Sequence, residues 1–240
     1  MRAYSFAAAG ALAAAALAVH AGCSSAAKNT GPTCNPCDDG GGQVAGHDTN
    51  PAGVPYPSSG YGQGARVGQS PGSVIKNFKF LGYPNADATQ GLQTIALADY
   101  YDPCGTTYHL LHLTVGGVWC APCNQETDDI VAAKATLDTN KIVVVQALAD
   151  GPVQGQDATQ GDLDKWIQKH HSNFTEMLDP GLTNLGGFFN AAAIPWNCDI
   201  DPRTMEIVKA GVGYEADVSS GLHSLPTNPG YTIPAVCGDN

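Results

Sequence analysis

The chain of 240 residues is long enough for one domain with extensions or for two small domains, and 43% hydrophobic residues suffice for a packed core. Its formal net charge of -11, from 22 acidic and 11 basic residues, excludes the basic footprint that a phosphate backbone requires, so no nucleic acid partner is expected. Such an acidic, self-repelling composition is typical of a soluble protein outside the cytoplasm.

The first residues predict secretion. After Arg2 comes an Ala-rich apolar run that is too short for a comfortable membrane span, so residues 1–22 are interpreted as a signal peptide. The run ends in HAGC, which resembles a bacterial lipobox with Cys23 as the lipidated first residue, although His20 replaces the usual aliphatic residue. The alternative is an ordinary signal peptide that is cut near Ala21. In both cases we expect an extracytoplasmic protein, at the periplasm or cell surface, in an oxidising compartment where disulfides persist.

The composition changes after the signal segment. Residues 23–67 are rich in Gly, Pro, Ser and Asn and show almost no apolar periodicity, which predicts a disordered tether that cannot bury a core. Residues 68–240 are predicted to form the globular domain.

The globular part alternates strand and helix patterns. Residues 73–83 indicate an edge strand or hairpin arm, and residues 94–102 a strand end followed by a helical turn. Further strands are predicted at 108–119, 141–150, 194–201 and 204–214, and helices at 122–137 and 162–171. The order strand, helix, strand, helix and two-stranded hairpin predicts an α/β fold in which helices flank a central mixed β-sheet.

The stretch VWCAPCNQE, residues 118–126, carries two cysteines two residues apart at the start of a predicted helix. Together with IVVVQALAD and AIPWNCDIDPRTMEIV, it resembles the thioredoxin-like fold. The nearest group is that of the membrane-tethered, extracytoplasmic thiol-disulfide oxidoreductases related to TlpA and ResA. The resemblance covers residues 74–213, and its WCxPC motif and downstream Ile-Pro are specific.

This resemblance implies roles for particular residues. Pro195, preceded by Ile194, would follow a cis peptide bond and face the disulfide. Trp119 would flank the site, and Trp196 stands where small hydroxyl residues are common, which would reshape the substrate groove. Asn197 departs from the family in the same way.

The resemblance also points to a proton relay. Thr114 occupies the place where cytoplasmic thioredoxins carry a buried Asp that takes part in proton transfer. Glu126 matches an acidic residue that the TlpA and ResA branch carries three positions after the second cysteine. Glu126 is therefore the candidate for this role.

A cysteine pair at a helix start can exchange disulfides. Unpaired N–H groups and the helix dipole favour the thiolate of Cys120, which is the attacking species. We expect Cys120 to form a mixed disulfide with a substrate and Cys123 to resolve it, with Glu126 removing the proton of Cys123. Substrates would be disulfide-bearing or dithiol extracytoplasmic proteins. The resemblance favours reduction, fed by a membrane electron donor, while the same steps run backwards would oxidise a dithiol and pass electrons to a membrane acceptor. No cofactor is expected.

Other interpretations of the pair are open. Cys120 and Cys123 could be a static disulfide, or they could share a zinc site with Cys34 and Cys37, which lie far upstream in the tether. The protein would then be a non-catalytic or metal-handling binding module on the same fold. A peroxidase of the peroxiredoxin kind is disfavoured, since Leu113 and Gly117 stand where its Pro and Thr would be.

The other cysteines and histidines suggest structural roles. With Cys23, Cys120 and Cys123 set aside, five of the 8 cysteines remain, so one should be free. Cys198, in a predicted buried strand, is the candidate for a free thiol, and Cys104 could pair with Cys237, although spacing does not settle connectivity. Cys34 and Cys37 would form a local disulfide or a second redox pair. His109 and His112, three apart in a strand, would point to opposite faces and make poor partners for one metal.

Overall fold

The computed structural model describes residues 47–58, 68–190, 193–225 and 237, all within the unit Gly40–Asn240. The predicted signal peptide, Cys23, Cys34 and Cys37 lie outside the described residues.

Residues 47–58, in the range of the predicted tether, pack against the domain. The Asn50 amide donates a hydrogen bond to the Tyr101 carbonyl (2.9 Å), and the Tyr56 hydroxyl donates to the Ile75 carbonyl (2.8 Å). The packed part of the chain therefore begins before residue 68.

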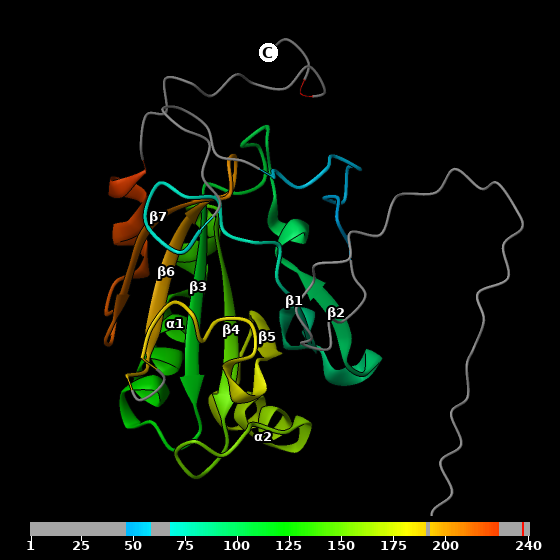
Figure 1. Cartoon of the computed structure of the whole chain (residues 1–240). Coiled ribbons are helices and arrows are strands. Elements are labelled where there is room, and N and C mark those ends of the chain that lie inside the picture. Colours follow the sequence, from blue (N-terminus) through cyan, green and yellow to red (C-terminus); the bar gives the residue numbers. More distant parts are fainter. Residues whose placement is uncertain (1–46, 59–67, 191–192, 226–236, 238–240) are drawn as a thin grey trace, which may run out of the picture. The chain divides into compact units, whose positions relative to one another are not determined.

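One sheet contains all seven strands of the described chain, in the order β2-β1-β5-β4-β3-β6-β7 (Figure 1). Its strands are β1 (Lys79–Tyr83), β2 (Gln93–Ala96), β3 (Leu110–Gly117), β4 (Ile142–Asp150), β5 (Thr175–Leu178), β6 (Trp196–Asp201) and β7 (Glu206–Val212). The central strands β3, β4 and β5 run parallel, and the outer pairs join them antiparallel. The predicted α/β class with a central mixed sheet is confirmed.

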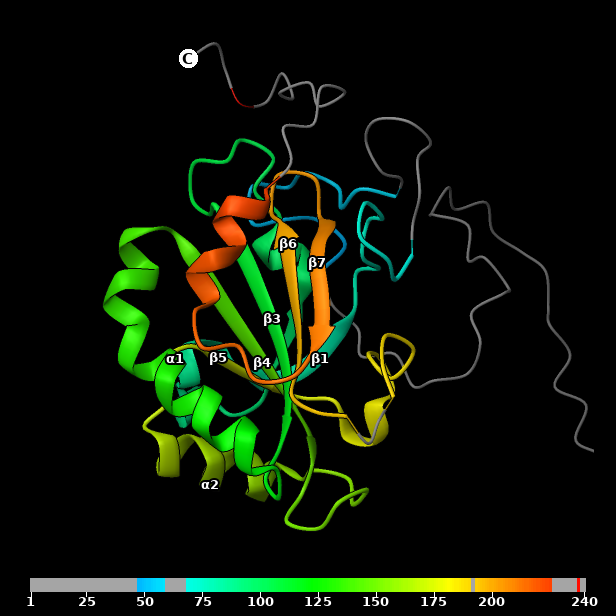
Figure 2. The same ribbon diagram turned by 90° about the vertical axis from the view of Figure 1, so that its left-hand side faces the viewer.

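Two α-helices, α1 (Ala121–Thr139) and α2 (Gln160–His170), lie on the same side of the sheet (Figures 1 and 2). The helix α2 begins at a capping box in which Thr159 and Asp162 each accept the other's backbone N–H. It ends where His171 takes the left-handed conformation (φ 53°). Short 3-10 helices complete the fold: η1 (Pro84–Ala86), η2 (Ala88–Gln90), η3 (Leu97–Tyr100), η4 (Pro180–Leu182) and η5 (Val218–Ser224).

The structure differs from the sequence prediction at two strands. The strand β1 was predicted as an edge strand or a hairpin arm; it is a hairpin arm that pairs antiparallel with β2, and β2 forms the edge. The strand β5 was not predicted, because four residues, TEML, are too few to show an alternating pattern and one of them is the charged Glu176.

The sheet has an apolar core on both faces. On the helix side, Leu110 and Val144 pack with Ile130 and Leu137 of α1 and with Val218 of η5. On the other side, inward residues of β3 and β4 pack with residues before and within β1 and around η3, among them Leu111, Leu113, Val115, Val145, Val74, Phe80 and Leu97.

One line of residues across the helix side of the sheet is polar. In register, Tyr83 of β1 lies beside Glu176 of β5, which lies beside Gln146 of β4, followed by Thr114 of β3 and Asn197 of β6. We call these five residues the polar row. All of them are buried, and α1 and α2 cover them. A buried polar line is costly unless its hydrogen bonds are made, so its partners determine what it can do.

Candidate active site

The cysteine pair lies where β3 ends and α1 begins, at the lower end of the sheet in Figure 1. Cys120 is the N-cap of α1, and Pro122 occupies the first turn, where no N–H is needed. Cys120 and Cys123 form a disulfide. The backbone N–H of Cys123 donates to Sγ of Cys120 (3.2 Å), so the helix start directs a hydrogen-bond donor at this sulfur.

The loop before β6 faces the same sulfur. The Ile194–Pro195 peptide bond is cis, as the resemblance implies. The carbonyl oxygen of Ile194 lies 3.6 Å from Sγ of Cys120. Two segments that are far apart in the sequence, 118–123 and 194–195, are thus brought together around Cys120.

Trp119 is anchored by a residue that the sequence analysis missed. Its indole N–H donates to Oδ2 of Asp150 (2.7 Å), which also accepts the backbone N–H of Gly155 (2.9 Å). A Cβ at Gly117 would lie 3.0 Å from the Asp150 Cβ and 3.2 Å from the Trp119 Nε1. Because Gly117 has no side chain, the Trp119 indole has the space to reach Asp150. The sequence did contain a signal for this role, since the acidic Asp150 ends a largely apolar strand.

Glu126 lies one turn after Cys123 on α1, and its exposed fraction is 0%. Its carboxylate accepts three hydrogen bonds: from the Thr114 hydroxyl (2.8 Å), the Asn197 amide (3.0 Å) and the Glu215 backbone N–H (2.7 Å). Thr114 does not replace the missing Asp of cytoplasmic thioredoxins. Instead, it holds the carboxylate of Glu126 over the same strand position.

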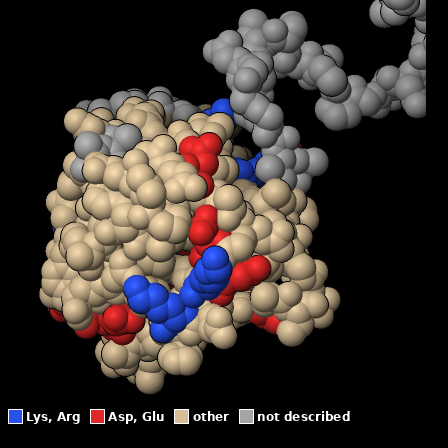
Figure 3. Space-filling model, turned by 90° about the horizontal axis from the view of Figure 1, so that it is seen from below, with Lys and Arg blue, Asp and Glu red and all other residues tan. Residues whose placement is uncertain are grey.

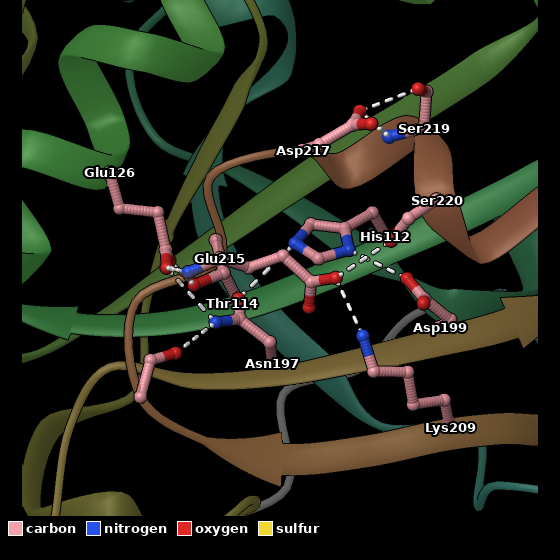
Figure 4. Close-up of polar contacts among 11 residues, drawn as sticks. His112, Thr114, Glu126, Asn197, Asp199, Lys209, Glu215, Asp217, Ser219 and Ser220 are labelled. Carbon is pink, nitrogen blue, oxygen red and sulfur yellow. Dashed lines mark hydrogen bonds and ion pairs between the residues drawn. The ribbon is translucent and has the colours of Figure 1, made fainter.

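A chain of hydrogen bonds continues from Glu126 into the sheet (Figure 4). The Asn197 amide NH₂ faces two acceptors, Glu126 and the Gly213 carbonyl, so its oxygen faces Nε2 of His112 (3.2 Å). Nδ1 of His112 pairs with Oδ1 of Asp199 (2.7 Å). Both ring nitrogens of His112 therefore have partners. His109, by contrast, lies before β3 and is exposed.

The remaining cysteines within the described residues are settled. Cys104 and Cys237 form a disulfide with a Cα–Cα distance of 5.4 Å, as the sequence allowed. Cys198 is free, as predicted. Burial raises the pKa of its thiol well above the ordinary value, and the charge of Asp199 raises it further. This thiol is therefore a poor nucleophile compared with that of Cys120.

Trp196, a candidate for the substrate groove, is 2% exposed. Its ring stacks on Phe189 (centroids 5.2 Å apart, 15° between planes) and also contacts Phe188 (5.1 Å). Both phenylalanines are half-buried. Trp196 therefore acts on a groove only through the two Phe rings that it supports. Of the other two candidates for the substrate groove, Trp119 is half-buried and Ile194 is 9% exposed.

No model of a known protein family matches the chain, and no curated protein matches it. Solved structures do match. The pneumococcal exposed lipoprotein thioredoxin from Streptococcus pneumoniae is 21% identical, over 62% of this chain and 99% of its own, with a TM-score of 0.44. A secreted disulfide oxidoreductase from Mycobacterium tuberculosis is 14% identical, over 62% and 96%, with a TM-score of 0.45. A DsbF homologue from Corynebacterium diphtheriae is 18% identical, over 64% and 87%, with a TM-score of 0.46.

The face seen from below Figure 1 is mostly neutral. Figure 3 shows its Lys, Arg, Asp and Glu residues gathered mainly in one band, with wide areas that carry none. Within the described ranges, no group of three or more His, Cys, Asp or Glu side chains is arranged to hold a metal ion. None of the helices in the described part of the chain is both long and apolar enough to cross a bilayer.

Proposed function

We propose that this protein is an extracytoplasmic thiol-disulfide oxidoreductase that reduces disulfides of exported proteins through Cys120 and Cys123. The observation that carries the proposal is the Cys120–Cys123 disulfide at the start of α1, opposite the cis Ile194–Pro195 bond. A static disulfide would not need a backbone donor directed at one of its sulfurs or a carbonyl edge beside it. Both features suit a sulfur that changes its bonding partner.

The first step follows from the helix start. In the reduced protein, the Cys123 N–H and the dipole of α1 stabilise a thiolate on Cys120. This thiolate attacks one sulfur of a substrate disulfide, a bond forms between Cys120 and that sulfur, and the second substrate sulfur leaves with the electron pair. Cys120 is 1% exposed in the oxidised protein, so a substrate must displace part of the cover around it.

The second step needs a proton acceptor near Cys123. We assign this role to Glu126, which shares the sheet-facing side of α1 with Cys123 and is held in place by three hydrogen-bond donors. The Cys123 thiolate then attacks Cys120, the disulfide of the protein re-forms, and the substrate is released with both sulfurs reduced.

The substrate would bind along the rim of the site. The carbonyl of Ile194 offers a hydrogen-bond acceptor to an extended chain beside Cys120, and Pro195, Trp119 and the aromatic group around Trp196 border it. Electrons would return through a membrane donor. A lipid anchor at Cys23, with the residues that follow as a tether, would keep the domain at the membrane.

The proposal is tested on the whole mature protein. In glutathione buffers of varied ratio, we expect Cys120 and Cys123 to interconvert reversibly between dithiol and disulfide, and the reduced protein to reduce insulin catalytically when a dithiol reductant is supplied. A redox potential near those of disulfide-reducing proteins supports the assigned direction. A more positive redox potential would mean that the protein oxidises its substrates instead. If the protein retains metal on dialysis and shows no turnover, it is a binding module and the proposal is wrong.

The Glu126→Gln variant is expected to accumulate the mixed disulfide. Gln keeps the shape but takes no proton, so resolution by Cys123 should slow by roughly tenfold to a hundredfold, while the attack by Cys120 changes little. The measurement is stopped-flow quenching followed by mass spectrometry of the trapped adduct.

The matched control is Glu215→Gln. Its side chain contacts Lys209 and Ser220, whereas the hydrogen bond to Glu126 comes from the Glu215 backbone and is kept. Equal rates in the Glu126→Gln variant and the natural protein would remove Glu126 from the mechanism.

A further inference from the structure

Gln146 of the polar row is oriented by the Trp166 indole. Its exposed fraction is 0%. The indole N–H of Trp166 donates to Oε1 of Gln146 (2.9 Å), and the Thr127 hydroxyl, whose single hydrogen can go to this oxygen or to the Cys123 carbonyl, lies 3.0 Å from each. Because an indole can only donate, the amide atom that it meets must be the oxygen. The NH₂ group of Gln146 therefore points away from these two residues.

That NH₂ group borders the space beside Cys123. The nitrogen is buried and has no hydrogen-bond partner among the residues that the structure describes. A Cβ placed on Gly116 would lie 3.6 Å from this nitrogen, 3.3 Å from Cβ of Cys123 and 3.9 Å from its Sγ. Gly116 has no side chain, so Gln146 and Cys123 face each other across the room left above it.

An unpaired buried donor is unfavourable, and natural structures rarely keep one without a reason. In the oxidised protein, Cys123 has its sulfur in a disulfide, which is a weak acceptor. After the disulfide opens, the same sulfur becomes a thiol or thiolate that is free to rotate about its Cα–Cβ bond. A thiolate is a charged acceptor, and hydrogen bonds to charged groups are the strong ones.

We propose that Gln146 donates a hydrogen bond to the Cys123 sulfur in the reduced protein and stabilises the thiolate that resolves the mixed disulfide. The inference rests on the proposed function. In this step the proton of Cys123 passes to Glu126, and the Cys123 thiolate attacks Sγ of Cys120. The bond between Cys120 and the substrate sulfur breaks, and that sulfur leaves with the electron pair and is protonated by water.

Gln146 and Glu126 have complementary tasks. Glu126 receives the proton, while Gln146 stabilises the negative charge that the proton leaves behind. The other titratable groups that face Gln146 are Glu176 from β5 and, behind Trp166, His170 of α2, which pairs with Asp128. Burial raises the pKa of Glu176 to about 8, so at neutral pH it adds no negative charge next to the thiolate.

The test measures the pKa of Cys123 in a Cys120→Ser background, from the pH dependence of its alkylation, scored on its own peptide by mass spectrometry. We expect Gln146→Leu to raise this pKa by about one unit. With both cysteines present, the same substitution should slow resolution of a mixed disulfide by roughly tenfold. An unchanged pKa in folded Gln146→Leu protein overturns the proposal.

Two further variants guard the interpretation. Gln146→Glu keeps an oxygen for Trp166 and Thr127 but replaces the donor by an acid, so it should raise the pKa of Cys123 at least as much; an unchanged or lower pKa overturns the proposal even if the Leu variant does not fold. Thr127→Val removes the hydroxyl that lies beside the same Oε1 and keeps the NH₂, so it should leave that pKa unchanged; a shift as large as that of Gln146→Leu would mean general loosening and also overturn the proposal. If the natural protein shows no turnover, the proposed function fails, while the pKa comparison still reports the Gln146–Cys123 contact.

Discussion

Cys120→Ser is expected to lower disulfide-reduction turnover by about a thousandfold or more, because a serine hydroxyl cannot take the place of the attacking thiolate. The loss should be one of chemistry and not of folding, since the substitution keeps a side-chain oxygen at the N-cap that can accept the Cys123 N–H. Turnover of insulin with a dithiol reductant is the readout, and circular dichroism checks the fold.

Two other cysteine variants make the result specific. Cys123→Ser should keep the first attack and trap a stable mixed disulfide between Cys120 and the substrate, which mass spectrometry detects. Cys198→Ser should retain turnover, because Cys198 is buried and free and takes no part in the exchange. Full activity in the Cys120→Ser variant would refute the assigned nucleophile, and loss of activity in the Cys198→Ser variant would point to damage in the core.

The second large effect is on stability and comes from Glu176. Its side chain is fully buried in β5, and within the described part of the chain neither carboxyl oxygen makes a hydrogen bond of normal geometry, although the nearby Ser172 hydroxyl acts to lower its pKa. Burial raises its pKa from 4.5 to about 8, so the folded protein keeps the acid neutral while the unfolded chain ionises it. The contribution of this group to the free energy of unfolding is therefore fully present below pH 4.5 and declines as the pH rises towards about 8. The expected slope is about 1.4 kcal/mol per pH unit for this one group.

Urea unfolding at a series of pH values measures this slope. Glu176→Gln should remove most of the decline and leave the protein more stable than the natural chain at pH 8, by roughly 2–4 kcal/mol, because the glutamine at this position does not ionise. Asp138→Asn is the matched control, since Asp138 lies on the exposed side of α1 and pairs with Lys134 at the surface. If Glu176→Gln and Asp138→Asn show the same slope as the natural protein, Glu176 does not titrate as its burial requires.

Glu176 also bears on why the polar row is present. The neutral acid and Gln146, whose NH₂ group has no partner among the described residues, are adjacent on neighbouring strands, and Thr114 and Asn197 continue the row to Glu126. A sheet built only for stability would place apolar side chains at these positions. The row lies beneath Cys123 and Glu126. At this place a redox pair needs groups that accept a proton, donate hydrogen bonds and orient the reacting side chains. Stability is thus given up at the place where the proposed chemistry occurs.

Much of the site could be predicted from local sequence. The WCAPC stretch, the Ile-Pro before a strand and the acidic residue at position 126 are short patterns whose chemistry depends on neighbouring residues. A helix start activates a cysteine, and a proline sets the local backbone, whatever surrounds them. Strands β3, β4, β6 and β7 and both α-helices were also predicted, because their lengths are enough for the periods of 2 and 3.6 residues to show.

The sequence by itself thus determined the fold class, the cysteine pair at the start of α1 and the free Cys198. Only the tertiary structure decided which distant residues meet: Cys104 with Cys237, Trp119 with Asp150, Glu126 with Thr114 and Asn197, and Gln146 with the space beside Cys123. A polar residue in an apolar strand shows in the sequence, but its partners come from register and from helix packing over the sheet. These depend on contacts between residues far apart in the chain, which no local pattern records.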